Sequence, residues 1–180
     1  MTAQAATIRC VRSLDADLVD ELARLLVDCV EGGASVGFMQ PLDAERARSF
    51  WRRVAQDVDE GARALLVAEQ DGRVVGSVHL VLSQPENQPH RAELVKMLVR
   101  RCARRQGLGA ALLREVEALA LARRKTLLVL DTANPDAERL YQRQGWQACG
   151  TIPGYALLPQ GGLCATTFYF RQLEAEPAPA

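Results

Sequence analysis

Apolar side chains recur at every third or fourth position in three long stretches of the chain, a spacing that places them on one face of an α-helix. The first stretch, 14–31, ends at a pair of glycines and carries the stripe Leu18, Leu22, Leu25 and Cys29. The second begins at Asp43, whose side chain can cap a helix, and ends at Gly61. The third, 107–124, ends in a basic turn that suits the negative end of a helix. We therefore predict three long helices, followed by a short one over 137–144.

Runs of apolar and β-branched residues between these helices predict β-strands. Asp71-Gly72 is a strong turn signal that joins 64–69 and 73–82 in a hairpin. The remaining predicted strands are 91–100, 127–130, 146–150 and 165–171, with a loop over 152–162 between the last two. Strands mixed with helices, several of them in hairpins, indicate an α/β or α+β layered domain with a mixed sheet.

Composition and charge set limits on the class of protein. A length of 180 residues suits one domain, which we place at 1–173, before a tail over 174–180 that we expect to be disordered. The formal net charge is zero, which argues against a nucleic-acid partner because phosphates require a basic surface. Because no apolar run is long enough for a membrane span and the start lacks a signal-peptide pattern, we expect no membrane partner. The five scattered cysteines suit reduced thiols in the cytoplasm, and the two histidines form no metal motif.

The segment 104–110, RRQGLGA, lies between a predicted strand and the start of the most apolar helix. Gly107 and Gly109 remove side chains where a backbone could approach a ligand closely. The first amides of a helix have no internal partners, and the helix dipole adds positive potential there. We predict an anion cradle suited to a pyrophosphate, with cationic donors from Arg100, Arg101, Arg104 and Arg105. A tight connection with solvated arginines is the alternative.

The glycine spacing fits neither of the two common phosphate-binding loops. A nucleoside-triphosphate loop requires Lys-Ser or Lys-Thr directly after its last glycine, and neither pair follows Gly107 or Gly109. A dinucleotide-binding loop requires G-x-G-x-x-G, and residue 112 is leucine instead of glycine. The anion is therefore expected to belong to another class of cofactor.

Two motifs occur in the order and spacing of one known family. Arg104, Gly107 and Gly109 form R-x-x-G-x-G after a strand. Downstream, 134–141 (NPDAERLY) is followed by Gly145-Trp146, and this is similar to N-x-x-A-x-x-L-Y-x-x-x-G-[FW]. Both resemble the GNAT superfamily of N-acetyltransferases, in which the first motif is the acetyl-coenzyme A loop.

The upstream strand, 92–99, resembles the splayed fourth strand of the same family, so the resemblance covers roughly residues 8–171. It implies an α/β (α+β) fold with a mixed, mostly antiparallel central sheet of about six to seven strands, flanked by about four helices. It also implies a cleft where the fourth and fifth strands splay apart.

The resemblance implies acetyl-coenzyme A as the cosubstrate and no metal. The pantetheine arm would lie along the fourth strand, with the amide of Val99 facing the thioester oxygen. The residues assigned to the cofactor in this way are Met97, Leu98, Val99, Arg104, Arg105, Gln106, Gly107, Gly109, Ala110 and Asn134. For Asn134, a turn residue before Pro135 is the alternative.

Three residues are candidates for proton transfer when an amine attacks the thioester. Tyr141 is the candidate general acid, because a phenol has a pKa near 10, comparable with that of an alkyl thiol; packing in the core is the alternative. Glu93 is the candidate base, because a carboxylate on an otherwise apolar strand is costly unless paired; an ion pair with Arg91 or Lys96 is the alternative. Asp131 would bind the substrate ammonium or serve as the base, unless it only caps the following turn.

Ser35 and Phe38, in a glycine-bounded loop, and Tyr155 are candidates for the substrate side, although most such loops are only connections. A narrower likeness, in EGGASVGF, RAELVKMLV, LLVLDT and PGY…FYF, is to the tabtoxin resistance acetyltransferases. That likeness implies a small amine or an amino-acid-like toxin as the acceptor, and hence a role in toxin or antibiotic resistance.

We therefore expect an N-acetyltransferase that acts on a primary amine of a small molecule by direct attack in a ternary complex. Two other functions stay open: a protein or peptide N-acetyltransferase, and a non-catalytic acyl-coenzyme A sensor. By analogy with similar domains, pairing of a sheet edge leaves a homodimer open as well.

Overall fold

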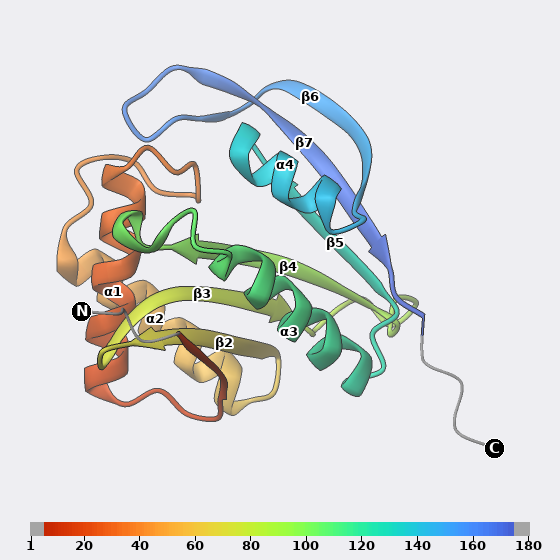
Figure 1. Ribbon diagram of the computed structural model, residues 1–180, viewed down its shortest axis with the longest axis horizontal. Coiled ribbons are helices and arrows are strands. Elements are labelled where there is room, and N and C mark those ends of the chain that lie inside the picture. The colour runs from red at the N-terminus through yellow and green to blue at the C-terminus, as the bar shows by residue number, and fades with distance from the viewer. Residues whose placement is uncertain (1–5, 175–180) are drawn as a thin grey trace.

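A computed structural model describes residues 6–174, so the predicted tail lies outside the described residues except for Glu174. The described chain folds into one seven-stranded sheet in the order β1-β2-β3-β4-β5-β7-β6 (Figure 1). Neighbouring strands are antiparallel except for the parallel pair β4–β5. The strands are β1 (Thr7–Val11), β2 (Arg63–Gln70), β3 (Arg73–Val81), β4 (Arg91–Val99), β5 (Leu127–Thr132), β6 (Gln147–Leu157) and β7 (Leu163–Gln172). The predicted fold class is confirmed.

The helices are α1 (Ala16–Glu31), α2 (Ala44–Asp59), α3 (Leu108–Ala122) and α4 (Pro135–Arg143), with a short 3₁₀ turn, η1 (Arg101–Ala103). Asp15, Asp43 and Asn134 cap α1, α2 and α4, because each side chain accepts a hydrogen bond from a first-turn amide. In contrast, α3 begins at Gly107 without any side-chain cap. Within residues 6–174 no helix is long and apolar enough to cross a bilayer.

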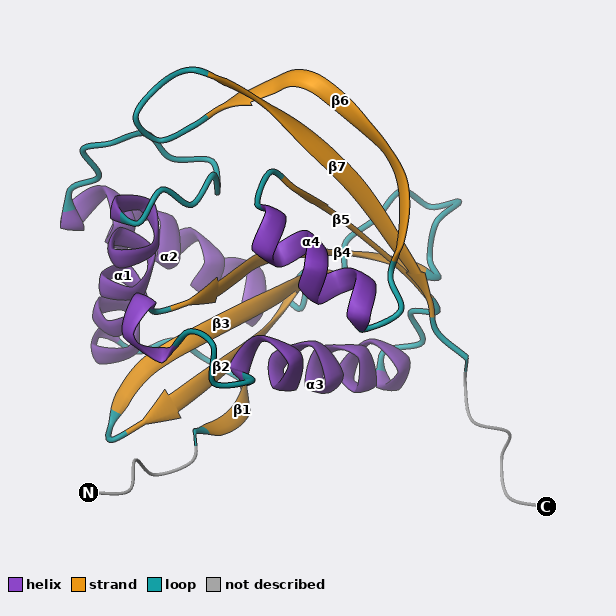
Figure 2. Ribbon diagram, turned by 45° about the horizontal axis from the view of Figure 1, so that its top comes forward, coloured by secondary structure: helices purple, strands orange, loops and turns teal. Residues whose placement is uncertain are grey.

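The helices cover the sheet from both sides and create two separate cores. On one face, α1 and α2 pack residues such as Leu22, Leu26 and Trp51 against Leu65 and Val67 of β2. On the other face, α3 and α4 pack against a second cluster that includes Leu112, Leu128 and Tyr169 (Figure 2). Since α1 and α2 contact β2, β3 and β4, the same face of β5, β7 and β6 is left without a helix among the described elements.

The parallel strands β4 and β5 separate shortly after they begin. Their pairing runs from Arg91 and Leu127 to Glu93 and Val129, although both strands continue beyond this point (Figure 1). Near the point of separation, β4 carries a bulge against β3, and Lys96 adopts a left-handed φ of 51°. The edge of β4 that faces β5 is therefore unpaired after Glu93.

Two predictions about the strands were wrong. The strand β1 was not predicted, because it is short and most of its side chains are exposed. The segment 152–157 belongs to β6 instead of to a loop, and β6 is exposed along nearly its whole length. An exposed edge strand lacks the alternation of apolar and polar positions by which a strand is recognised in a sequence.

Candidate functional site

A cavity of about 480 Å³ opens where β4 leaves β5, between the end of β4, the N-terminus of α3 and α4. Its lining includes all the predicted cofactor residues except one: Met97, Leu98, Val99, Arg104, Arg105, Gly107, Gly109, Ala110 and Asn134. The exception is Gln106, whose side chain donates a hydrogen bond to the carbonyl of Cys102 at 3.2 Å. The structure thus gathers the residues of the two sequence motifs around one space.

The loop before α3 has the backbone that an anion cradle requires. Gly107 has a left-handed φ of 80°, and a β-carbon at this position would meet nothing within 4 Å. The amides of the first turn of α3 have no helical partner, and no side chain caps them. Gly109 has a different requirement, because a β-carbon there would lie 2.9 Å from Leu140 of α4. Gly107 thus shapes the open loop, whereas Gly109 allows α3 and α4 to pack closely.

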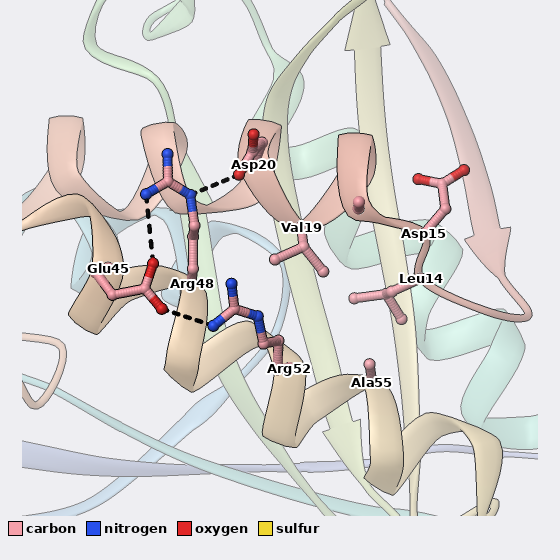
Figure 3. Close-up of a pocket in the computed structure, with 9 residues that line it drawn as sticks. Leu14, Asp15, Val19, Asp20, Glu45, Arg48, Arg52 and Ala55 are labelled. Carbon is pink, nitrogen blue, oxygen red and sulfur yellow. Dashed lines mark hydrogen bonds and ion pairs between the residues drawn. The ribbon is translucent and has the colours of Figure 1, made fainter.

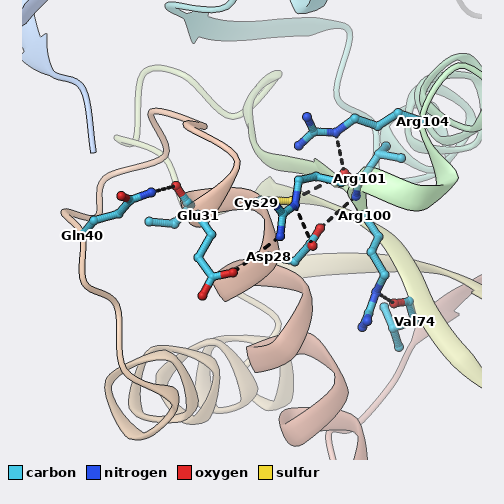
Figure 4. Close-up of polar contacts among 10 residues, drawn as sticks. Asp28, Cys29, Glu31, Gln40, Val74, Arg100, Arg101 and Arg104 are labelled. Atoms are coloured by element: carbon cyan, nitrogen blue, oxygen red, sulfur yellow. Dashed lines mark hydrogen bonds and ion pairs between the residues drawn. The ribbon is translucent and has the colours of Figure 1, made fainter. Parts of the chain in front are cut away.

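Of the four arginines predicted to face this loop, only two line the cavity, Arg104 and Arg105. The prediction is wrong for Arg101, which donates to Asp28 from its main-chain amide at 2.8 Å and from Nε at 2.9 Å (Figure 4). It is also wrong for Arg100, whose Nε donates to the carbonyl of Val74 at 3.3 Å (Figure 4). Burial alone would raise the pKa of Asp28, but the hydrogen bonds from Arg101 outweigh burial and lower it. These two arginines attach η1 to α1 and β3.

Several cavity residues were missed in the sequence. Five of them lie on α4, namely Asp136, Ala137, Arg139, Leu140 and Arg143, and Cys29 and Ala34 come from the end of α1 and the loop after it. The α4 residues recur at helical spacing within the same motif that drew attention to Tyr141, so a helical projection would have found them. No signal in the sequence marked Cys29, whose Sγ donates to the carbonyl of Val99 at 3.5 Å (Figure 4).

Tyr141, the candidate acid, lies in the core of the α3 and α4 side. Its ring centroid lies 5.7 Å from that of Trp146 and 6.0 Å from that of Tyr169. Its hydroxyl forms no hydrogen bond with any residue in the described part of the chain. Burial raises the pKa of Tyr141, and the nearby Asp131 carboxylate raises it further. A raised pKa keeps the phenol protonated, as a general acid must be before transfer, but makes it a weaker donor than an ordinary tyrosine.

Glu93 is the last β4 residue that pairs with β5, and its side chain forms neither a hydrogen bond nor an ion pair within residues 6–174. The alternative of a salt bridge therefore does not occur in the structure. The Nε of Arg91 donates to Gln88 at 2.7 Å, and the ammonium of Lys96 lies 5.6 Å from the centroid of the Phe50 ring. An unpaired carboxylate thus stands at the point where the strands separate.

Asp131 projects from the same face of the sheet as Glu93, because Val129 is the partner of Glu93 and side chains alternate along β5. Leu128 and Leu130 point the other way, into the core beneath α3 and α4. Desolvation raises the pKa of the Asp131 carboxyl, while the charge of Lys96 partly offsets the rise. The two candidate bases therefore share one face.

We call this surface the open face and define it by Glu93, Lys96, Asp131 and Phe168. Two aromatic contacts flank it: Phe38 packs edge-on against Phe50, and Tyr155 against Phe168, each with ring centroids 5.4 Å apart. Asp131 is paired with Phe168 across β5 and β7, so both side chains lie on the same face. Phe38 and Tyr155 were predicted for the substrate side, and the structure packs Phe38 against Phe50, the ring beneath the Lys96 ammonium, and Tyr155 against Phe168.

The loop between α1 and α2 meets the turn between β6 and β7. The hydroxyl of Ser35 donates to the carbonyl of Leu157 at 3.4 Å, and the main-chain amide of Gln40 donates to the carbonyl of Pro159 at 2.8 Å. These two segments approach each other in both overall views (Figures 1 and 2). Ser35 therefore holds together two loops beside the open face.

A second cavity, of about 530 Å³, lies between α1 and α2, and Leu14, Val19 and Ala55 form its apolar wall (Figure 3). Both of its arginines are in ion pairs, since Arg48 contacts Asp20 and Arg52 contacts Glu45, each at 2.6 Å. It contains none of the predicted site residues. Neither cavity holds a metal-binding group, because residues 6–174 contain no cluster of three or more histidine, cysteine or acidic side chains able to hold an ion.

Comparison with solved structures shows that other acetyltransferases share this fold. A ribosomal-protein-alanine N-acetyltransferase from Brucella melitensis is 25% identical, with a TM-score of 0.78 over 93% of this chain and 99% of that one. An N-acetyltransferase from Staphylococcus aureus Mu50 is 20% identical, with a TM-score of 0.78 over 95% and 100%. A GNAT superfamily phosphinothricin acetyltransferase from Sinorhizobium meliloti, in complex with AcCoA, is 20% identical, with a TM-score of 0.77 over 94% and 89%.

The sequence also matches a family model. The model of the acetyltransferase (GNAT) family covers residues 19–146, which span the chain from α1 to the tryptophan after α4. This range contains the open edge of β4, the loop before α3 and Tyr141. The chain therefore belongs to the acetyltransferase (GNAT) family.

Proposed function

We propose that this enzyme transfers the acetyl group of acetyl-coenzyme A to a primary amine of a small molecule. One observation carries the proposal. The cavity at the uncapped N-terminus of α3 continues along the unpaired edge of β4. This edge leads to two carboxylates that form no ion pair with the described residues, Glu93 and Asp131. Such an arrangement can hold a long anionic donor at one end and receive an amine at the other.

The donor would be held by backbone groups at both of its ends. The diphosphate would accept hydrogen bonds from the first amides of α3, with Arg104 and Arg105 beside it. The pantetheine arm would pair with the free edge of β4 like an added strand. The amide of Val99 would then face the thioester oxygen, and one preorganised donor at a developing oxyanion lowers the barrier by about 3 kcal/mol.

In the reaction, the neutral amine attacks the thioester carbon and forms a tetrahedral intermediate. The carbon–sulfur bond then breaks, and Tyr141 gives its proton to the departing thiolate. Glu93 or Asp131 takes the proton that the amine nitrogen loses. The raised pKa of Asp131 supports it as a base, because a carboxylate with a higher proton affinity removes a proton from an ammonium more readily.

The loop contacts beside the open face favour a small acceptor over a protein. Ser35 and Gln40 tie the α1–α2 loop to β6 and the β6–β7 turn, which restricts the space through which a polypeptide would have to pass. The phosphinothricin acetyltransferase with the same fold and the likeness to tabtoxin resistance enzymes support an amino-acid-like acceptor and a role in resistance. The likeness to a ribosomal-protein-alanine N-acetyltransferase favours a protein amino terminus as the second candidate.

The test combines calorimetry with a thiol-release assay. We expect acetyl-coenzyme A to bind and free thiol to appear when amines from a chemically varied panel are added. No affinity for acetyl-coenzyme A would refute the proposal at its first step. Binding without thiol release for any amine would support a sensor, and modification of a proteome extract without reaction of any small amine would support a protein acetyltransferase.

A further inference from the structure

Three nitrogen groups without acceptors lie close together where β3 and β4 meet α2. Within the described residues, Nε1 of Trp51 and Nε2 of His79 are buried and have no hydrogen-bond partner. The two rings are in contact, with centroids 5.0 Å apart. The ammonium of Lys96 likewise forms no hydrogen bond or ion pair with the described residues, and it acts electrostatically on His79. Buried donors are nearly always satisfied in folded proteins, so such a cluster indicates a missing acceptor.

His79 presents a donor at its unpartnered nitrogen. Nη1 of Arg63 lies 3.4 Å from Nδ1 of His79, and a guanidinium can only donate, so Nδ1 accepts. Burial lowers the pKa of His79, and the charges of Arg63 and Lys96 lower it further, so the imidazole is neutral. A neutral imidazole that accepts at Nδ1 carries its proton at Nε2. The indole nitrogen of Trp51 is also only a donor.

Lys96 is held in place by an unusual backbone. Its φ of 51° lies in the bulge of β4, next to the point where β4 leaves β5. The ammonium lies over the Phe50 ring, and a β-carbon on Gly37 of the α1–α2 loop would lie 4.0 Å from it. Burial lowers the pKa of Lys96, as does the charge of Arg63, whereas Asp131 and Glu93 raise it. An ammonium that is partly desolvated and has no anionic partner within 4 Å lacks the compensation that buried charges ordinarily have.

We propose that Lys96, whose side chain is only partly buried, binds an acidic group of the acceptor, so that the substrate carries a carboxylate as well as its reactive amine. This inference rests on the proposed function and specifies its substrate class. Glu93 and Asp131 lie on the same face and would attract the ammonium end of the same molecule. The aromatic rings of Phe38 and Phe50 would contact its apolar part.

The test compares matched substrates on the unmodified enzyme. Each α-amino acid in a panel that includes phenylalanine, methionine and leucine is assayed beside its methyl ester and its decarboxylated amine. We expect the acid to have a kcat/KM about ten- to a hundredfold higher than the ester and the amine, as a hydrogen-bonded charge pair gives. Equal or better turnover of the ester and the amine would overturn the inference without affecting the proposed function.

Lys96→Met then tests the residue. We expect the advantage of the acid to disappear, mainly through a higher KM, while the ester and the amine change little and coenzyme A affinity is unchanged. Arg53→Met is the matched control, because it removes one positive charge from an exposed position on α2 and should keep the advantage. An advantage that survives in Lys96→Met would overturn the inference. If that variant does not fold, the comparison of acid and ester on the unmodified enzyme still decides the outcome.

Discussion

Replacement of Gly107 by alanine tests the anion cradle most directly, because the structure separates its two effects. Gly107 has a φ of 80°, which costs an L-amino acid about 1–2 kcal/mol in folding free energy. Gly61, in the turn between α2 and β2, has a φ of 73° and is equally open, since a β-carbon at either position meets nothing within 4 Å. Gly61→Ala is therefore a control with the same backbone strain, far from the cavity.

We expect both variants to lose about the same stability, roughly 2–8 °C in Tm for a chain of this size. Only Gly107→Ala should weaken coenzyme A binding, because its β-carbon would project where the phosphate oxygens must approach the α3 amides. Loss of one charge-assisted hydrogen bond of about 1.5–3 kcal/mol corresponds to about a ten- to hundredfold weaker Kd.

Thermal shift and calorimetry measure the two effects separately. At a coenzyme A concentration of about a hundred times the wild-type Kd, the ligand should stabilise the wild type and Gly61→Ala by about 2.7 kcal/mol. A tenfold weaker site in Gly107→Ala would give about 1.4 kcal/mol under the same conditions. Equal coenzyme A affinity in the two variants would refute the placement of the diphosphate at this loop.

Four further substitutions test the acid, the base and the acceptor site. Tyr141→Phe should lower kcat by roughly a hundredfold or more with coenzyme A affinity unchanged, and wild-type turnover across the pH range would remove the role of Tyr141. Glu93→Gln and Asp131→Asn should differ in their pH profiles. If Asp131 is the base, the kcat/KM of the wild type rises with pH at a midpoint above 3.8, the ordinary pKa of an aspartate. In that case Asp131→Asn loses this rise and Glu93→Gln keeps it. Lys96→Met should raise Tm at pH 7 without ligand, because burial lowers the pKa of Lys96 and the folded chain therefore disfavours its charge. That gain should shrink as the pH rises towards 10.5, where the unfolded chain also loses the charge, and an unchanged Tm at pH 7 would contradict the burial argument.

The cofactor loop could be predicted from sequence because its residues are local. Arg104, Gly107 and Gly109 lie within six positions of one another, and the helix that follows sets the direction of their amides. The destinations of the four arginines could not be predicted in the same way. Arg101 begins the single turn η1 and Arg104 follows it. This turn directs Arg101 towards α1 and Arg104 into the cavity.

The acceptor side was only partly predictable because its residues come from distant elements. Glu93 drew attention as a charge on an apolar strand, and the structure leaves it unpaired. Trp51, His79 and Lys96 come from α2, β3 and β4, and only the packing of α2 on the sheet brings them together. No spacing along the chain marks such a cluster, since strand order and the β4 bulge decide which side chains meet.

The ion pairs elsewhere in the molecule show why the charges of the open face are unusual. Asp20, Asp28 and Asp57 each have an arginine within 3.0 Å, so acidic side chains near a basic one generally find it. On the open face, Asp131 and Glu93 raise the pKa of Lys96 and Lys96 lowers that of Asp131, yet among the described residues Lys96 forms an ion pair within 4 Å with neither carboxylate. Folding alone would favour pairing them, because a partly buried charge gains most from a direct partner. Opposite charges held apart on one surface are instead suited to a ligand that carries both signs, with its carboxylate at Lys96 and its ammonium towards Glu93 and Asp131.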